Sequence, residues 1–193
     1  MVDETENVTE QLVNGVYTFE NVTANHTIAA AFAINNYMIT ATAGDNGTIT
    51  PAQVSVNHGA SQEFTITADA GYRIASVMVD ETEDVTAQLV DGVYTFVNVT
   101  ANHTINATFA INTYVITATA GENGTITPNG EVNVNYGATQ AFTIEANDDY
   151  RIMSVLVDGT EAISELVDGV YTFTNVTANH TIAATFVSET ATT

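Results

Sequence analysis

The sequence repeats itself with a spacing of 77 residues, and this self-similarity constrains the fold more than any other feature. The segment Gly-Val-Tyr-Thr-Phe starts at Gly15, Gly92 and Gly169, and Asn-Val-Thr-Ala-Asn-His-Thr-Ile recurs in step with it. Copies of one small unit bury their apolar residues within each copy and against the neighbouring copy. We therefore expect a tandem array of small modules.

The copies divide the chain into two full repeats and one partial repeat. Residues 37–113 and 114–190 are the full repeats, and residues 191–193 form a tail. Residues 1–36 match the closing part of a repeat, residues 78–113, at 29 of 36 positions. The partial repeat is thus the C-terminal half of a module, without the opening strands.

Two explanations of the partial repeat stay open. Met1 aligns with Met78, an internal residue of a full repeat, so we interpret the chain as a window of a longer array. The alternative is a genuine N-terminus whose half repeat is completed by another molecule. The short tail after Phe186 is too small to supply the missing part, which favours the longer array.

Each repeat has the pattern of strands separated by turns. Phe64–Ala68 and Ile105–Phe109 alternate apolar and polar residues, and β-branched Thr fills many of the polar positions. Asn46-Gly47 lies between two such runs and predicts a hairpin turn, because both residues tolerate positive φ. The chain is therefore expected to be all-β, with tandem β-sandwich or β-grasp-like modules of about seven strands each.

The apolar strand positions predict one modest core in each module, since a unit of this size buries roughly 60 % of its unfolded surface. In the first full repeat the predicted core residues are Tyr37, Ile39, Ile49, Val54, Phe64, Ile66, Tyr72, Ile74, Val77, Val79, Leu89, Tyr94, Phe96, Ile105 and Phe109. The junction Phe109–Tyr114 contains no Gly and no Pro, unlike a flexible linker. We expect the last strand of one repeat to run into the first strand of the next, and the array to be a stiff rod.

Composition excludes several functions. The chain has 23 acidic and 2 basic residues, a net charge of −21, whereas nucleic acids and anionic membranes require clustered Lys and Arg. The longest apolar run, Ile28–Ile34, is too short to span a bilayer, so no membrane insertion is expected. Absence of Cys and Lys removes disulfides, thiolate metal sites and Lys-based isopeptide bonds. No set of nucleophile, base and acid is evident, so we expect no enzyme activity.

The titratable residues offer one candidate cation site. One His recurs in each copy, at His26, His103 and His180, and we interpret it as a turn residue bonded to backbone, since a metal site needs several converging ligands. The acidic run consists of Asp80, Glu81, Glu83 and Asp84 and is a candidate calcium site, because calcium takes six to eight oxygen ligands. The alternative is a solvated loop that keeps the protein soluble.

Asn-x-Thr sequons are frequent and mark candidate glycosylation sites. The alternative explanation is that turn Asn residues precede strand Thr residues. The candidates are Asn21, Asn25, Asn46, Asn98, Asn102, Asn123, Asn175 and Asn179.

The repeat resembles the divergent internalin-type B-repeat. The resemblance rests on Tyr-x-Ile-Thr-Ala-Thr-Ala-Gly, Asn-Gly-Thr-Ile-Thr-Pro and Gly-Tyr-Arg-Ile-x-Ser-Val, and on the closing Val-Tyr-Thr-Phe motif, and covers residues 1–187. The third copy departs from it at Asp148-Asp149-Tyr150, which puts the turn geometry there in question. The resemblance implies a module of long secreted or cell-surface proteins of bacteria and archaea, in stalks and adhesive arrays.

These observations predict a non-catalytic structural repeat of an extracellular fibre, stalk or adhesin, with neighbouring repeats or identical chains as partners and filaments as one outcome. The first alternative is an array of carbohydrate-binding modules with a cell-surface or glycan ligand. That alternative needs exposed aromatic residues, and Tyr136 is the residue that the pattern leaves free to stack. The second alternative is a passive spacer for another domain.

Overall fold

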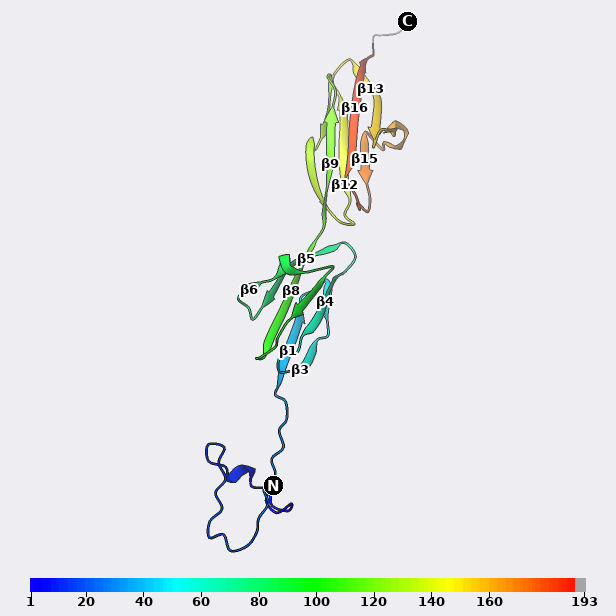
Figure 1. Cartoon of the computed structure of the whole chain (residues 1–193). Coiled ribbons are helices and arrows are strands. Elements are labelled where there is room, and N and C mark those ends of the chain that lie inside the picture. The colour runs from blue at the N-terminus through cyan, green and yellow to red at the C-terminus, as the bar shows by residue number, and fades with distance from the viewer. Residues whose placement is uncertain (190–193) are drawn as a thin grey trace. The chain divides into compact units, whose positions relative to one another are not determined.

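The computed structural model describes residues 1–189. They form a first unit, residues 1–36, and a second unit from residue 37 onward that contains both full repeats. The second unit consists of strands, turns and short 3-10 helices, which confirms the all-β prediction (Figure 1). Residues 191–193, the predicted tail, lie outside the described residues. In the described part of the chain, no helix has the length and apolar character needed to cross a bilayer.

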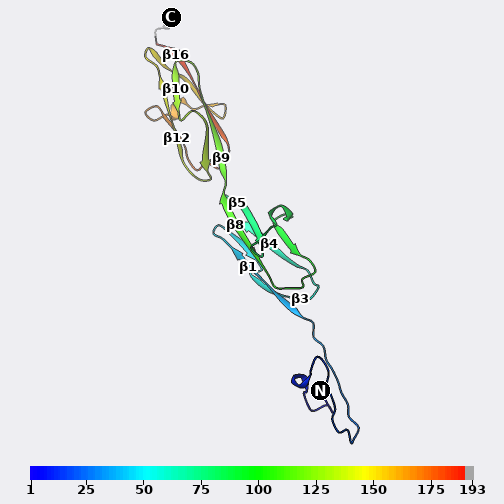
Figure 2. The same ribbon diagram turned by 90° about the vertical axis from the view of Figure 1, so that its left-hand side faces the viewer.

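The first full repeat is a two-layer structure of eight strands and one 3-10 helix. The elements are β1 (Asn36–Ala43), β2 (Gly47–Thr50), β3 (Gln53–Asn57), β4 (Gln62–Ala68), β5 (Tyr72–Val79), β6 (Glu83–Asp84), η2 (Thr86–Gln88), β7 (Val93–Phe96) and β8 (His103–Ile111). One sheet has the order β3-β1-β8-β5-β6 and the other the order β2-β4-β7. Figures 1 and 2 both show β1 beside β8, and these two strands pair in parallel, with Ile39 opposite His103.

The second full repeat has the same topology. Its elements are β9 (Thr113–Ala120), β10 (Gly124–Thr127), β11 (Gly130–Asn135), β12 (Gln140–Ala146), β13 (Tyr150–Val157), β14 (Thr160–Glu161), η3 (Ile163–Glu165), β15 (Val170–Phe173) and β16 (His180–Ser188). The sheets have the orders β11-β9-β16-β13-β14 and β10-β12-β15. Compared with the expected seven strands, each repeat gains one two-residue strand, β6 or β14.

The core of each repeat lies between its two sheets. In the first full repeat the core cluster contains every predicted residue except Tyr72. Its buried members also include four residues that are absent from the predicted core: Val56, Val85, Val99 and Ala107. Val85 and Val99 lie in connections outside the strands, where alternation carries no information about burial. Phe64 and its counterpart Phe142 are fully buried at the centres of the two cores.

The hairpin predicted at Asn46-Gly47 is wrong, because this turn joins strands of different sheets. Asn46 has the expected positive φ of 69°, but β1 pairs with β3 and β8, whereas β2 pairs with β4. Gly47 is needed for a different reason: a Cβ there would lie 2.3 Å from Cζ of Phe109. The missing side chain allows an aromatic ring to lie directly on the strand.

The first unit contains little regular structure. It has one 3-10 helix, η1 (Thr9–Gln11), and isolated bridges that include Val2 with Ile28. Val2 and Val8 are buried, but most of its other apolar side chains are exposed. The unit therefore has only a small core, although its sequence nearly matches residues 78–113.

Candidate functional site

Each copy of the repeat holds a His ring against an Asp carboxylate, and in the two full repeats this His is the first residue of the last strand, β8 or β16. In the first full repeat, Nδ1 of His103 donates to Oδ2 of Asp80 at 2.7 Å, and the backbone N–H of Thr104 donates to Oδ1 at 2.8 Å. The other two copies repeat this His–Asp clamp, as His26–Asp3 at 2.8 Å and His180–Asp158 at 2.6 Å.

The clamp follows from the turn after β5. Asp80 and Glu81 have positive φ values of 49° and 60°, and the N–H of Asp80 donates to the carbonyl of Thr104 at 3.0 Å. This turn directs the carboxylate at the first residues of β8, while the His103 ring packs on Phe96 with centroids 5.2 Å apart. The expectation that the His bonds to backbone is therefore wrong, because its partner is a side-chain carboxylate.

The clamp lowers the pKa of its carboxylates. Burial acts to raise the pKa of Asp80, but the hydrogen bonds from Thr104 N–H and His103 outweigh it and hold the pKa below its ordinary value. The same balance lowers the pKa of Asp158. For Asp3, the hydrogen bond from His26 is the main cause of a lowered pKa. In residues 1–189 the His hydrogen bonds all use Nδ1, and each joins a turn to a segment more than twenty residues further along the chain.

The acidic run proposed for calcium has its carboxylates engaged separately. Asp80 belongs to the clamp, and Oδ1 of Asp84 accepts the N–H of Thr86 at 2.9 Å, which lowers the pKa of Asp84. The other two members, Glu81 and Glu83, are exposed. Within residues 1–189, no three His, Cys, Asp or Glu side chains form a group that could hold a metal ion. Calcium binding at this turn remains a prediction.

The sequon Asn residues lie mostly on exposed turns. Asn123 is half-buried, and the exposed candidates are Asn21, Asn25, Asn46, Asn98, Asn102, Asn175 and Asn179. Two of them also have a structural role: Oδ1 of Asn102 accepts the N–H of Met38 at 2.8 Å, and Oδ1 of Asn179 accepts the N–H of Val115 at 2.9 Å. Glycosylation of these residues remains a prediction.

The junction between the two full repeats is a packed contact. The strand β8 ends at Ile111 and β9 begins at Thr113, so Asn112 alone separates them. The N–H of Asn112 donates to the carbonyl of Gly71 at 2.8 Å, and its carbonyl accepts the N–H of Tyr136 at 2.9 Å. The Tyr136 ring lies against Gly71, where a Cβ would be 2.2 Å from its Cδ1. The interpretation of Tyr136 as a free stacking residue is therefore wrong.

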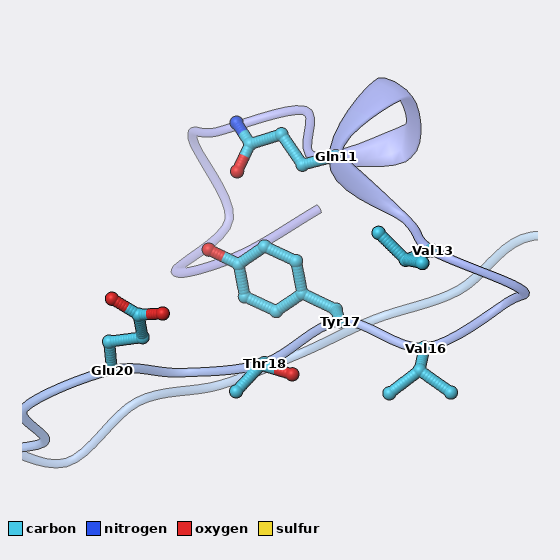
Figure 3. A pocket seen from close by; sticks show the side chains of 6 residues that line it. All are labelled: Gln11, Val13, Val16, Tyr17, Thr18 and Glu20. Atoms are coloured by element: carbon cyan, nitrogen blue, oxygen red, sulfur yellow. The ribbon is translucent and has the colours of Figure 1, made fainter.

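A shallow groove lies beside the Asp91-Gly92 turn, where Val90 and Val93 bridge. Its walls include Gln88, Val93 and Tyr94, together with Glu63 from β4. The first unit has the corresponding groove, shown in Figure 3, in which Tyr17 and Glu20 project to the side of Gln11 and Val16 projects away. These grooves show no converging set of catalytic groups.

One of these relationships could have been found from the sequence. Asp recurs before the His in every copy, as Asp3, Asp80 and Asp158, so the pair was visible as a shared feature of the repeats. The contact of Tyr136 with Gly71 had no such signal, because the matching residues are His58 and Asp149.

The fold and these sites define a class of protein, namely tandem all-β repeats with recurring structural clusters. The sequence profile of the divergent InlB B-repeat domain matches residues 37–113 and 114–190. The chain belongs to this family.

Other comparisons add little. A search of curated proteins gives no match. Among solved structures, the I-band fragment I67-I69 from titin is similar, with 13 % identity over 82 % of this chain and a TM-score of 0.17. The alignment spans 66 % of that fragment, just under two thirds of its length, and a score this low carries no argument.

Proposed function

We propose that the chain is a non-catalytic structural segment of an extracellular fibre, stalk or adhesin. The observation that carries this proposal is the junction at Asn112, a single residue whose backbone bonds to both full repeats. A Gly/Ser-rich linker would let neighbouring modules move independently. Here the packing of Tyr136 on Gly71 opposes such motion, as expected for repeats that hold another domain or another chain at a distance.

The charge of the chain fits an extracellular role. A net charge of −21 opposes adsorption to anionic surfaces and keeps neighbouring chains soluble. The repulsion between repeats acts over about 8 Å at physiological salt. Family membership also supports a surface location, because the resemblance to internalin-type repeats implies secreted or cell-surface proteins.

Self-assembly into filaments is the finer part of the proposal. In the first full repeat β3 and β6 are the outer strands of one sheet, and β2 and β7 those of the other. Outer strands present unpaired backbone groups that can add a strand from another chain. Pairing of this kind would join identical chains laterally.

The coupling of the repeats can be measured with paired spin labels. Val90 and Val167 are equivalent, 70 % and 72 % exposed, and the chain has no Cys, so V90C and V167C give two unique labels. We expect double electron–electron resonance to give one narrow distribution of the distance between the two labels. The distribution should broaden in Tyr136→Ala. A broad distribution in the otherwise unchanged chain would contradict the proposal.

Electron microscopy separates the assembly modes. Filaments of uniform width would support self-assembly. If a calcium chelator dissolved the filaments, the assembly would depend on a bound cation. Separate particles at all concentrations would contradict the filament and favour a stalk or spacer. Glycan binding by such particles would favour the adhesin form of the proposal.

A further inference from the structure

Four Asn residues of this chain are each followed by Gly, the combination in which an Asn side chain reacts most readily with its own backbone. They are Asn14, Asn46, Asn123 and Asn129. In this reaction the peptide nitrogen of the Gly attacks Cγ of the Asn, and Gly favours it because no Cβ obstructs the approach. The attacking nitrogen must lie beside the side-chain carboxamide. The conformation of each turn therefore decides which of the four can react.

Three of the four Asn residues have a left-handed backbone, which is unfavourable for the attack. The φ values are 50° at Asn14, 69° at Asn46 and 68° at Asn123. In this region ψ is also positive, about 47°, and it directs the next peptide nitrogen away from the Asn side chain. Cyclisation at these positions would first require the turn to open.

The turns within the full repeats are also held by tertiary contacts. The carbonyl of Asn46 accepts the N–H of Asp69 at 3.0 Å, and the following Gly47 lies against the ring of Phe109. The turn at Asn123 repeats both contacts. Rearrangement of either Asn would therefore disturb a hydrogen bond and a packed ring.

Asn129 differs from the other three in conformation and in surroundings. It lies between β10 and β11, outside the left-handed region, and both it and Gly130 are exposed. The N–H of Gly130 donates to Oδ1 of Asn129 at 2.9 Å, which holds the nitrogen beside the carboxamide that it would attack. Apart from its chain neighbours, no residue of the described chain lies within 4 Å of the position that a Cβ of Gly130 would take. The site therefore has room for a ring to form.

This Asn-Gly pair belongs to the second full repeat alone. In the first full repeat Pro51 is followed by Ala52 and Gln53, with one residue fewer and no Asn-Gly pair. A reaction at Asn129 would thus make two otherwise equivalent repeats chemically different.

We propose that Asn129 is a site of spontaneous deamidation, at which the fold itself brings the reacting groups together. The nitrogen of Gly130 gives up its proton to water and forms a bond to Cγ of Asn129. The bond from Cγ to Nδ2 breaks, and Nδ2 takes up a proton and leaves as ammonia. Water then opens the resulting succinimide ring: attack at Cγ gives Asp, and attack at the main-chain carbonyl carbon gives isoaspartate.

The modification changes the beginning of an outer strand. Both products add one negative charge next to β11, which lies at the edge of its sheet. Isoaspartate also lengthens the main chain by one methylene group. Gly130 forms the first pair of the β11–β9 ladder, with Ala118, so the longer main chain would disturb this end of the strand. The modification accumulates with time, and it therefore distinguishes old copies of the protein from new ones.

The test incubates the folded full chain at physiological temperature and follows the four Asn-Gly pairs by peptide mapping. Each deamidation adds about 1 Da, and electron-transfer fragmentation distinguishes isoaspartate from Asp. We expect Asn129 to deamidate at least about tenfold faster than Asn14, Asn46 and Asn123, because these three react only when their turns open. A smaller difference from any of the three would overturn the proposal.

The unfolded chain is the matched control. In guanidinium chloride the four turns lose their conformations, so the four rates should come within about threefold of one another. If Asn129 kept its advantage there, the neighbouring sequence and not the fold would set the rate, which would overturn the proposal. In the folded chain, Asn129→Gln should abolish the fast release of ammonia, because the longer side chain would have to close a six-membered ring. Unchanged release would place the reaction at another residue.

Hydrogen exchange tests the effect on the strand. We expect faster exchange over residues 130–135 in the isoaspartate form than in Asn129→Asp, which carries the new charge without the additional methylene group. Equal exchange in the two forms would contradict the predicted change in β11.

Discussion

The ring of Tyr136 lies against the backbone of Gly71, so a side chain of the second full repeat covers a turn of the first. The matching residue in the second full repeat is Asp149, with a φ of 67° where Gly71 has 83°. The carbonyl of Asp149 accepts the N–H of Glu189 at 2.9 Å, as the carbonyl of Gly71 accepts that of Asn112. The Asp at position 149, which departs from the family pattern, therefore preserves the turn. Gly is needed at position 71, where the Tyr136 ring lies on the backbone.

Gly71→Ala should destabilise the chain and loosen the junction. Alanine pays about 1–2 kcal/mol for the left-handed conformation, and its Cβ would also displace the Tyr136 ring. The free energy of unfolding in urea and the width of the spin-label distance distribution measure the two effects. Gly137→Ala is the matched control: its φ of 74° is similar, but a Cβ there would lie 3.7 Å from Oδ1 of Asn175. Equal behaviour of the two variants would show that the ring contact contributes nothing.

Gly47→Ala should destabilise the first full repeat by about 1–3 kcal/mol, the usual cost of overpacking. The new Cβ would lie 2.3 Å from Phe109, which packs against the core. Gly124→Ala should behave alike, because Phe186 lies equally close to that position. Chemical denaturation provides the measurement. Gly44→Ala is the control, because a Cβ there would lie 3.4 Å from the carbonyl oxygen of Ala107. A larger loss in the control would contradict this account.

The His–Asp clamp should stabilise the fold above acidic pH. The pKa of Asp80 is lower in the folded chain than its ordinary value of 3.8, so the ionised carboxylate stabilises the fold above that value. This contribution is lost as the pH falls through the lowered folded pKa. We expect Asp80→Asn to cost roughly 1 kcal/mol or less at neutral pH, because the pair is partly exposed, and the difference from the unchanged chain to shrink below about pH 4.

Comparing variants is necessary because acid also relieves the repulsion within a chain of charge −21. Denaturant unfolding between neutral and acidic pH measures the difference. Asp45→Asn removes an exposed carboxylate outside any clamp and controls for net charge. A pH-independent difference for Asp80→Asn would mean that the ionised form is not what the clamp requires.

Asn102→Ala should cost about 1 kcal/mol in protein made without N-glycosylation, because the N–H of Met38 loses its acceptor. Asn179→Ala removes the equivalent bond to Val115 and should cost a similar amount. Asn25→Ala removes the same residue type from a copy without this bond, so thermal and urea unfolding should be unchanged. If Asn25→Ala lowered the stability as much as the other two substitutions, the effect would come from the Asn in the turn and not from the hydrogen bond to β1 or β9.

Much of the fold could be predicted from local pattern. Alternation over residues such as Phe64 and Ile66 shows which face of a strand is buried, and Asp91-Gly92 marks a turn whose φ values are indeed positive, 50° and 78°. The spacing of the copies also predicts two equivalent cores. These features depend on residues close together in the chain, so the sequence alone is sufficient to find them.

Which segments meet was decided by the tertiary structure. The Asn46-Gly47 turn has the local signal of a hairpin, yet the strands on either side belong to different sheets: β1 pairs with β3 and β8, and β2 pairs with β4. The contact of His103 with Asp80 spans 23 residues, and that of Tyr136 with Gly71 spans a repeat boundary. The amino-acid sequence by itself determined the strands, the buried faces and the repeat. The pairing of strands and the clamp and junction contacts depend on long-range packing, which no local pattern encodes.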